Sequence, residues 1–163
     1  MAQIRKMDCQ VEVKSSAEKI FDAFNTKAHL MPKMSSRLIS DIKLLEGEWN
    51  SPGSVRLWHY VVAGDKQLQE NVDEKNSTIV AKELRESVDE KNRTMVYKLL
   101  DGEIKNSYNS WKTILSVTPK GEGSLVKWTF EYEKKNDDVP EPVEYCDFHT
   151  AWAKDVDDYL LNA

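Results

Sequence analysis

The feature that most constrains the fold is the stretch PEPVEYCDFHTAWAKDVDDYLL at residues 140–161. At about 100° per residue, one face of a helix here spans an arc of roughly 120° and is mostly apolar and aromatic. This face holds Tyr145, Phe148, His149, Trp152, Val156, Tyr159 and Leu160, and the opposite face holds Asp147, Thr150, Lys154, Asp157 and Asp158. We predict one long helix with one solvated face. The aromatic face suits either a plain core or the wall of a cavity, and the pattern leaves both open.

Most of the remaining chain alternates apolar and polar residues, which is typical of strands with one buried face. We predict strands near residues 7–14, 39–45, 54–64, 94–100, 110–117 and 124–134, and hairpin tips at the two VDEKN segments, 72–76 and 88–92. Two short helices follow the first strand, near residues 17–25 and 28–30, with Ser15 and Glu18 at capping-box spacing. The last strand has one aromatic face, and only the long C-terminal helix can cover it. This order predicts an α+β fold in which a curved antiparallel sheet wraps one helix.

Length and charge narrow the functional classes. A chain of 163 residues predicts a single domain over residues 1–163. A net charge of −5 disfavours nucleic acid, which attracts basic surfaces. The chain has neither an apolar signal core nor an apolar run of membrane-spanning length, so we expect a cytoplasmic protein without a membrane partner. We further expect a monomer or weak dimer.

The two cysteines, Cys9 and Cys146, lie far apart in the sequence and have no CxxC companion. This spacing supports neither zinc nor thioredoxin-like chemistry. We expect free, partly buried thiols, because disulfides are rare in the cytosol, and a disulfide between the two remains open.

Three segments carry a resemblance to a known family: GSVRLWHY (53–60), VDEKNRTMVYKLLDGEI (88–104) and TPKGEGSLVKWTFEYEK (118–134). They resemble the major latex protein group of plants, within the Bet v 1-like superfamily that includes the pathogenesis-related-10 proteins. The resemblance covers almost the whole chain. It implies a helix-grip fold: a seven-stranded curved antiparallel sheet around a long C-terminal helix, with two short helices and an internal hydrophobic cavity.

The sequence departs from this pattern in several places. GEWNSPG (47–53) replaces the glycine-rich loop of the pathogenesis-related relatives, so phosphate-loop and ribonuclease functions transfer poorly. Residues 63–78 look like extra length, in a lengthened or additional hairpin. The gate loop of the abscisic-acid receptors is absent, which argues against a hormone receptor.

No established catalytic motif stands out. His29, His59 and His149 are scattered, so we expect no metal site, and no nucleophile elbow, phosphate loop or dinucleotide fingerprint is present, so we expect no cofactor. What remains is a set of aromatic side chains with a few polar groups, the usual lining of a small-molecule pocket. The candidate ligand-binding residues are Trp58, His59, Tyr60, Tyr108, Trp111, Trp128, Tyr145, His149 and Trp152. Trp58 and Tyr60 share one face of their strand and His59 lies on the other, and the sequence leaves open which face is inward.

The first functional hypothesis is a protein that binds small hydrophobic plant metabolites, such as terpenoids, steroids, alkaloids or hormone-like molecules, as a carrier or accessory protein of specialised metabolism. The alternative is a cavity enzyme that cyclises or isomerises a reactive terpenoid or alkaloid intermediate, because the superfamily includes such catalysts. His149 and Tyr145 are then the candidate catalytic residues, since imidazole can exchange a proton near neutral pH. A third reading is a stress or defence protein that acts through its surface.

Overall fold

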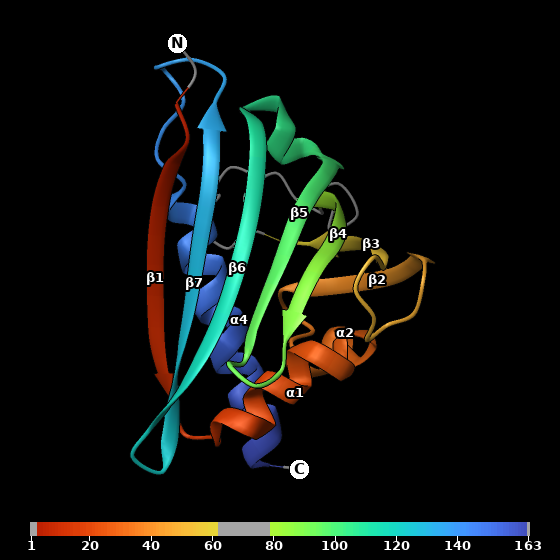
Figure 1. Cartoon of the computed structure of the whole chain (residues 1–163), viewed down its shortest axis with the longest axis vertical. Coiled ribbons are helices and arrows are strands. Elements are labelled where there is room, and N and C mark those ends of the chain that lie inside the picture. Colours follow the sequence, from red (N-terminus) through yellow and green to blue (C-terminus); the bar gives the residue numbers. More distant parts are fainter. Residues whose placement is uncertain (1–2, 62–78, 163) are drawn as a thin grey trace.

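The computed structural model describes residues 3–61 and 79–162. Within these residues, seven antiparallel strands form one sheet in the order β1-β7-β6-β5-β4-β3-β2, and a long helix, α4 (Val143–Leu161), lies along one face of it (Figure 1). The strands are β1 (Arg5–Val13), β2 (Ile39–Glu46), β3 (Val55–Tyr60), β4 (Ile79–Asp89), β5 (Thr94–Gly102), β6 (Tyr108–Lys120) and β7 (Gly123–Lys134). This arrangement confirms the expected seven-stranded helix-grip fold.

Short helices cover one end of the sheet. They are α1 (Ala17–Thr26), η1 (Ala28–Leu30) and α2 (Met31–Met34), and Figure 1 shows α1 and α2 near the C-terminal end of α4. A further turn of helix, η3 (Glu103–Asn106), connects β5 to β6. Ser16, rather than Ser15, caps α1, and its side chain accepts a hydrogen bond from the Lys19 N–H at 3.3 Å. The predicted cap was therefore wrong by one residue.

The aromatic face of strand β7 packs against α4 and is buried by it. The alternation of β7 places Val126, Trp128, Phe130 and Tyr132 on one face, and each of them is at most 2% exposed. Trp128 stacks on Trp152 of α4, with ring centroids 5.7 Å apart. Burying side chains of this size contributes about 1.5–3 kcal/mol each, so the aromatic face of β7 anchors α4. This confirms the predicted cover of the last strand.

The acidic end of α4 has a structural role that the helical pattern did not reveal. Asp157 is buried, and its carboxylate accepts hydrogen bonds from the backbone N–H groups of Lys14 at 3.0 Å and Ser15 at 2.8 Å. The placement of Asp157 on the solvated face was therefore wrong. Asp155, two residues earlier on α4, accepts hydrogen bonds from the Ser35 hydroxyl at 2.7 Å and from the Arg37 guanidinium at 2.9 Å. Together these carboxylates tie the end of α4 to the segments that follow β1 and α2.

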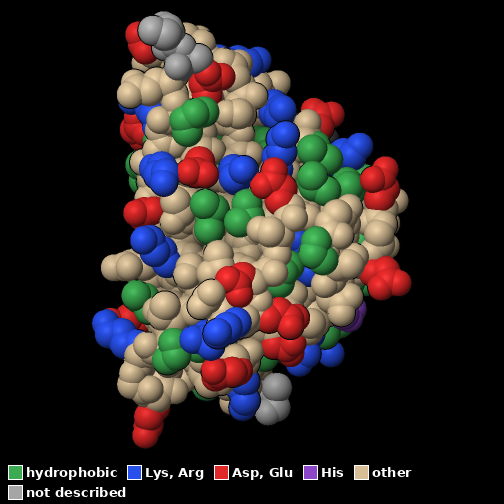
Figure 2. Space-filling view, viewed as in Figure 1, with side chains coloured by type: hydrophobic (Ala, Val, Ile, Leu, Met, Phe, Trp, Pro, Cys, Tyr) green, Lys and Arg blue, Asp and Glu red, His purple; other side chains and the backbone are tan. Residues whose placement is uncertain are grey.

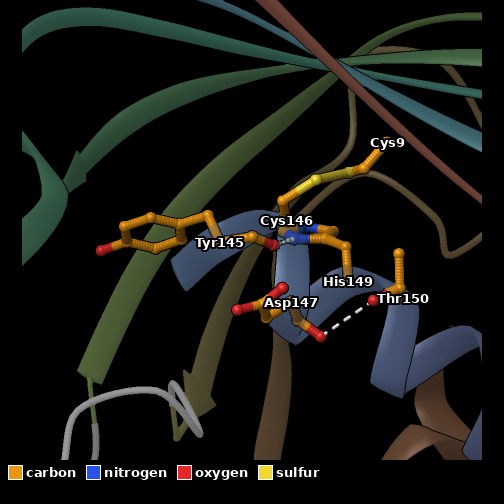
Figure 3. Close-up of a disulfide and its surroundings, with 6 residues drawn as sticks. All are labelled: Cys9, Tyr145, Cys146, Asp147, His149 and Thr150. Carbon is orange, nitrogen blue, oxygen red and sulfur yellow. Dashed lines mark hydrogen bonds between the residues drawn. A yellow bond between two sulfur atoms is a disulfide. The ribbon is translucent and has the colours of Figure 1, made fainter. Parts of the chain in front are cut away.

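A disulfide links Cys9 of β1 to Cys146 in the first turns of α4 (Figure 3). The two Cα atoms are 5.8 Å apart although 137 positions separate them in the sequence. The expectation of free thiols was wrong, because the start of α4 passes directly over the edge strand that carries Cys9. The disulfide joins the start of α4 to the sheet, as Asp157 joins its end.

The second VDEKN segment forms the turn between β4 and β5, as predicted. The first VDEKN segment and the proposed hairpin at residues 63–78 lie outside the described residues. In the part of the chain that the structure describes, no helix has the length and apolar character that crossing a membrane requires.

Candidate ligand-binding cavity

A cavity of ≈ 70 Å³ lies between the sheet and α4. Every strand except β1 contributes to its lining, together with α4 and the short helices. The lining comprises Phe24, Ala28, Met31, Ile39, Arg56, Trp58, Tyr60, Ala81, Glu83, Tyr97, Leu99, Ile104, Trp111, Thr113, Leu115, Trp128, Tyr145, Phe148, His149 and Trp152. An engineered apolar cavity of roughly 150 Å³ takes up benzene, so a ligand of terpenoid size enters this cavity only if lining side chains move.

The lining is held by contacts between aromatic rings. Trp152 lies edge-on to both Trp58, at a centroid distance of 5.2 Å, and Phe24, at 5.0 Å. Trp111 contacts Tyr145 of α4 at 5.2 Å. Such pairs stabilise a fixed arrangement beyond the area they bury, so β3, β6, α1 and α4 share one aromatic wall.

The structure brings most of the sequence-predicted residues together. Trp58, Tyr60, Trp111, Trp128, Tyr145, His149 and Trp152 all line the cavity. The inward face of β3 is therefore the one with Trp58 and Tyr60, and His59 lies on the opposite face because neighbouring side chains in a strand alternate. Tyr108 is buried beside the cavity but does not line it, and its hydroxyl donates to the Pro140 carbonyl at 2.9 Å, just before α4 begins.

His149 is held as a neutral imidazole. Its ring lies against Trp128, with centroids 4.7 Å apart, and Phe130, at 4.8 Å. Nδ1 is 2.7 Å from the Tyr145 carbonyl oxygen, and since a carbonyl only accepts, Nδ1 carries the proton and donates (Figure 3). Burial lowers the pKa of His149 to about 4, so at neutral pH it is a hydrogen-bonding group and a weak base. Burial also raises the pKa of Tyr145 to about 12, so its hydroxyl stays protonated.

Sequence reasoning missed four polar residues of the lining: Arg56, Glu83, Tyr97 and Thr113. Arg56 precedes Trp58 by two residues and shares its inward face, and Glu83 of β4 pairs with Arg56 across the β3–β4 ladder. The alternation of β3 predicts that Arg56 lies on the same face as Trp58. This prediction identifies Arg56 as a cavity residue only when the inward face of β3 is known.

Glu83 is a carboxyl group in an aromatic environment. The Trp58 Nε1–H donates to its Oε1 at 3.2 Å. Burial raises the pKa of Glu83 to about 7, while the nearby Arg56 guanidinium opposes this shift. A carboxyl group with a pKa of about 7 can gain or lose a proton close to neutral pH.

The chemistry of this lining is that of an apolar binding site with a few fixed polar groups. Among residues 3–61 and 79–162, no group of three or more His, Cys, Asp and Glu side chains is arranged to hold a metal ion. The cavity can bury an apolar ligand, offer hydrogen bonds from Arg56 and Tyr145, and exchange a proton through Glu83.

Comparison with known proteins places this architecture in a family. Residues 2–163 match the pathogenesis-related protein Bet v 1 family. The chain is 34% identical over 161 residues to MLP-like protein 34 of Arabidopsis thaliana; this match covers 95% of the chain but only 46% of that protein, so the chain spans about half the length of this relative.

Solved structures show the same fold. The ginseng (Panax ginseng) major latex-like protein 151 superposes with a TM-score of 0.84 at 29% identity, over 96% of this chain and 97% of that one. Norcoclaurine synthase from Thalictrum flavum, solved in complex with dopamine and hydroxybenzaldehyde, superposes with a TM-score of 0.75 over 99% of this chain and 88% of that one; at 17% identity it shows the fold alone. By sequence and by structure, the chain belongs to the pathogenesis-related protein Bet v 1 family, in its major latex protein group.

Proposed function

We propose that this protein binds a small hydrophobic plant metabolite in the cavity between the sheet and α4, as a carrier or accessory protein of specialised metabolism. The observation that carries the proposal is the aromatic lining of this cavity, in which Trp58, Trp111, Trp128 and Trp152 converge from three strands and one helix. Burying roughly 200 Å² of apolar ligand surface contributes about 5 kcal/mol before the costs of association. Terpenoids, steroids, alkaloids and hormone-like molecules are the proposed ligand classes.

To test this proposal, a panel of such compounds is titrated into the wild-type protein and into two variants, each of which introduces a leucine. Ala81→Leu fills the cavity, because Ala81 lines it. Val80→Leu is the matched control, because Val80 neighbours Ala81 on β4 and lies on the other face of the sheet. We expect Ala81→Leu to weaken binding at least about tenfold and Val80→Leu to leave it unchanged. Absence of saturable binding, or equal affinity in both variants, would overturn the proposal.

The second candidate function is a cofactor-free enzyme that cyclises or isomerises a reactive terpenoid or alkaloid intermediate. Glu83 favours it, since a carboxyl group with a pKa of about 7 inside a cavity suits general acid–base catalysis. In this proposal Tyr145 and His149 orient the intermediate through hydrogen bonds. Product chromatography with Glu83→Gln, Tyr145→Phe and wild-type protein tests it, and unchanged rates and product ratios in both variants would count against it.

The remaining expectations stay proposals: a single domain, a monomer or weak dimer, and no nucleic-acid partner. The proposed cytoplasmic location has the Cys9–Cys146 disulfide against it, because cytosolic thiols are kept reduced. A surface-acting defence protein has little support on the face seen in Figure 2, where acidic and basic side chains are interspersed with scattered hydrophobic ones.

A further inference from the structure

Arg56 brings a positive charge into the cavity without full compensation. It lines the cavity and is 0% exposed. Its Nη2 donates to the Trp49 carbonyl, but Nε and Nη1 are buried and have no hydrogen-bond partner. Among the described residues, no carboxylate lies within 4.0 Å of its guanidinium nitrogens. Buried polar groups in native proteins are almost always paired, so two unpaired donors on one guanidinium point to a missing acceptor.

A second buried arginine adds to the positive charge. Arg85 is also 0% exposed, and its Nη2 donates to two uncharged acceptors, the Asn25 carbonyl at 2.8 Å and the Met95 Sδ at 3.0 Å. The ring of Tyr97 lies close to both arginines, with its centroid 5.8 Å from the Arg56 Cζ and 5.9 Å from the Arg85 Cζ. Cation–π contacts hold the two guanidinium groups in place but do not neutralise them.

Among the described residues, Glu83 is the only carboxylate that lines the cavity, and it accepts a hydrogen bond from the Trp58 Nε1–H. Even with Glu83 ionised, two arginines against one carboxylate leave an excess of one positive charge. A buried charge without compensation is unfavourable, and an anion placed beside it gains both the Coulomb attraction and the unmade hydrogen bonds. With Glu83 ionised, a carboxylate monoanion compensates this excess of one positive charge.

We propose that the ligand of this cavity is a hydrophobic carboxylic acid, whose carboxylate accepts a hydrogen bond from one of the two unpaired donors of Arg56, Nε or Nη1, while its apolar body lies against the aromatic lining. This inference rests on the proposed function and adds the chemical class of the ligand. Arg56 is then the residue that selects an acid over an uncharged analogue of the same shape.

The test compares each acid with its own amide, which has the same shape and no charge. The probes are benzoate with benzamide and, as a larger pair, naphthalene-2-carboxylate with naphthalene-2-carboxamide, titrated into the full chain by isothermal titration calorimetry. We expect each acid to bind about 10- to 100-fold more tightly than its amide, the range for hydrogen bonds to a charged group. Arg56→Gln should lower acid affinity to the level of the amide, and Arg56→Lys should retain a preference for the acid.

Lys43→Gln is the matched control, because it removes one positive charge from an exposed position on the neighbouring strand β2. We expect it to leave the acid-to-amide ratio unchanged. Equal binding of acid and amide by wild-type protein overturns this inference and leaves the proposed function standing, whereas no binding of either overturns both. A preference for the acid that survives in Arg56→Gln also overturns it. If Arg56→Gln does not fold, the wild-type ratio and the Arg56→Lys variant decide the question.

Discussion

His149 and Glu83 line the same cavity, and burial shifts their pKa values in opposite directions. The pKa of His149 falls to about 4 and that of Glu83 rises to about 7. Both side chains are therefore mostly neutral in the folded protein between these values. The two shifts predict opposite dependences of stability on pH, and two substitutions separate them.

The sign follows from which state binds more protons. In the unfolded chain His149 titrates near 6.5, so as pH falls from 6.5 toward 4 the unfolded state takes up a proton that the folded state does not. Its contribution to the free energy of unfolding then decreases by about 3 kcal/mol. Unfolded Glu83 titrates near 4.5, so as pH rises from 4.5 toward 7 the unfolded state releases a proton that the folded state keeps. The contribution of Glu83 to the free energy of unfolding therefore decreases by about 3 kcal/mol as pH rises.

Urea unfolding at several pH values between 4 and 8 measures both effects. Subtracting the wild-type profile removes the groups that a variant shares with wild type. Relative to wild type, Glu83→Gln should gain about 3 kcal/mol in free energy of unfolding as pH rises across this range, because only the loss due to Glu83 has been removed. His149→Phe should gain a similar amount as pH falls, on top of a constant cost for the lost hydrogen bond.

Glu144→Gln is the control for this experiment, since Glu144 is an exposed carboxylate on α4 outside the cavity lining. Relative to wild type, this variant should show a smaller change with pH than Glu83→Gln or His149→Phe. Profiles of Glu83→Gln and His149→Phe that run parallel to that of wild type would refute the reasoning, because they would show that neither side chain is held neutral by burial.

Three further predictions concern what holds α4 and the sheet in place. Asp157→Ala removes the acceptor of two backbone N–H groups and should lower the free energy of unfolding by about 3 kcal/mol. Asp158→Ala, at an exposed position, is the control and should change this free energy by less than about 0.5 kcal/mol. Equal losses for the two variants in urea unfolding would contradict this prediction. Cys9→Ser removes the disulfide and should cost about 2–4 kcal/mol, and an unchanged thermal midpoint under non-reducing conditions would show that no such link forms. Gly102→Ala places a Cβ against the backbone of β4 at a φ of +134° and should lower the thermal midpoint clearly more than Gly121→Ala, which has open space at a φ of +59°; similar midpoints would argue against this close approach.

The sequence predicted those parts of the fold in which hydrophobic periodicity alone identifies the buried face of a strand or helix. The alternation ending in WTFEYEK and the helical pattern of residues 140–161 each showed a single aromatic face, and one face had to cover the other. The contacts that fix α4 were not predictable in this way. Cys9 with Cys146, and Asp157 with the β1–α1 connection, are pairs distant in sequence, and their proximity depends on how α4 crosses β1.

In the candidate site, too, hydrophobic periodicity predicted some residues and missed others. Aromatic residues on α4 and β7 were found because hydrophobic periodicity marks the buried face. Arg56 and Glu83 were missed because charged side chains are ordinarily solvated, and because β3 carries an aromatic ring on each face, Trp58 on one and His59 on the other. Only the register that pairs Arg56 with Glu83 shows that both enter the cavity.

The most direct test of the central claim, that the space between the sheet and α4 binds an apolar ligand, is a crystal structure of the protein saturated with naphthalene, an uncharged probe. We predict ligand density inside the cavity, in contact with Trp58 and Trp152, with lining side chains displaced to enlarge its ≈ 70 Å³. Density confined to the outer surface, or a cavity unchanged at saturating naphthalene, would contradict the account.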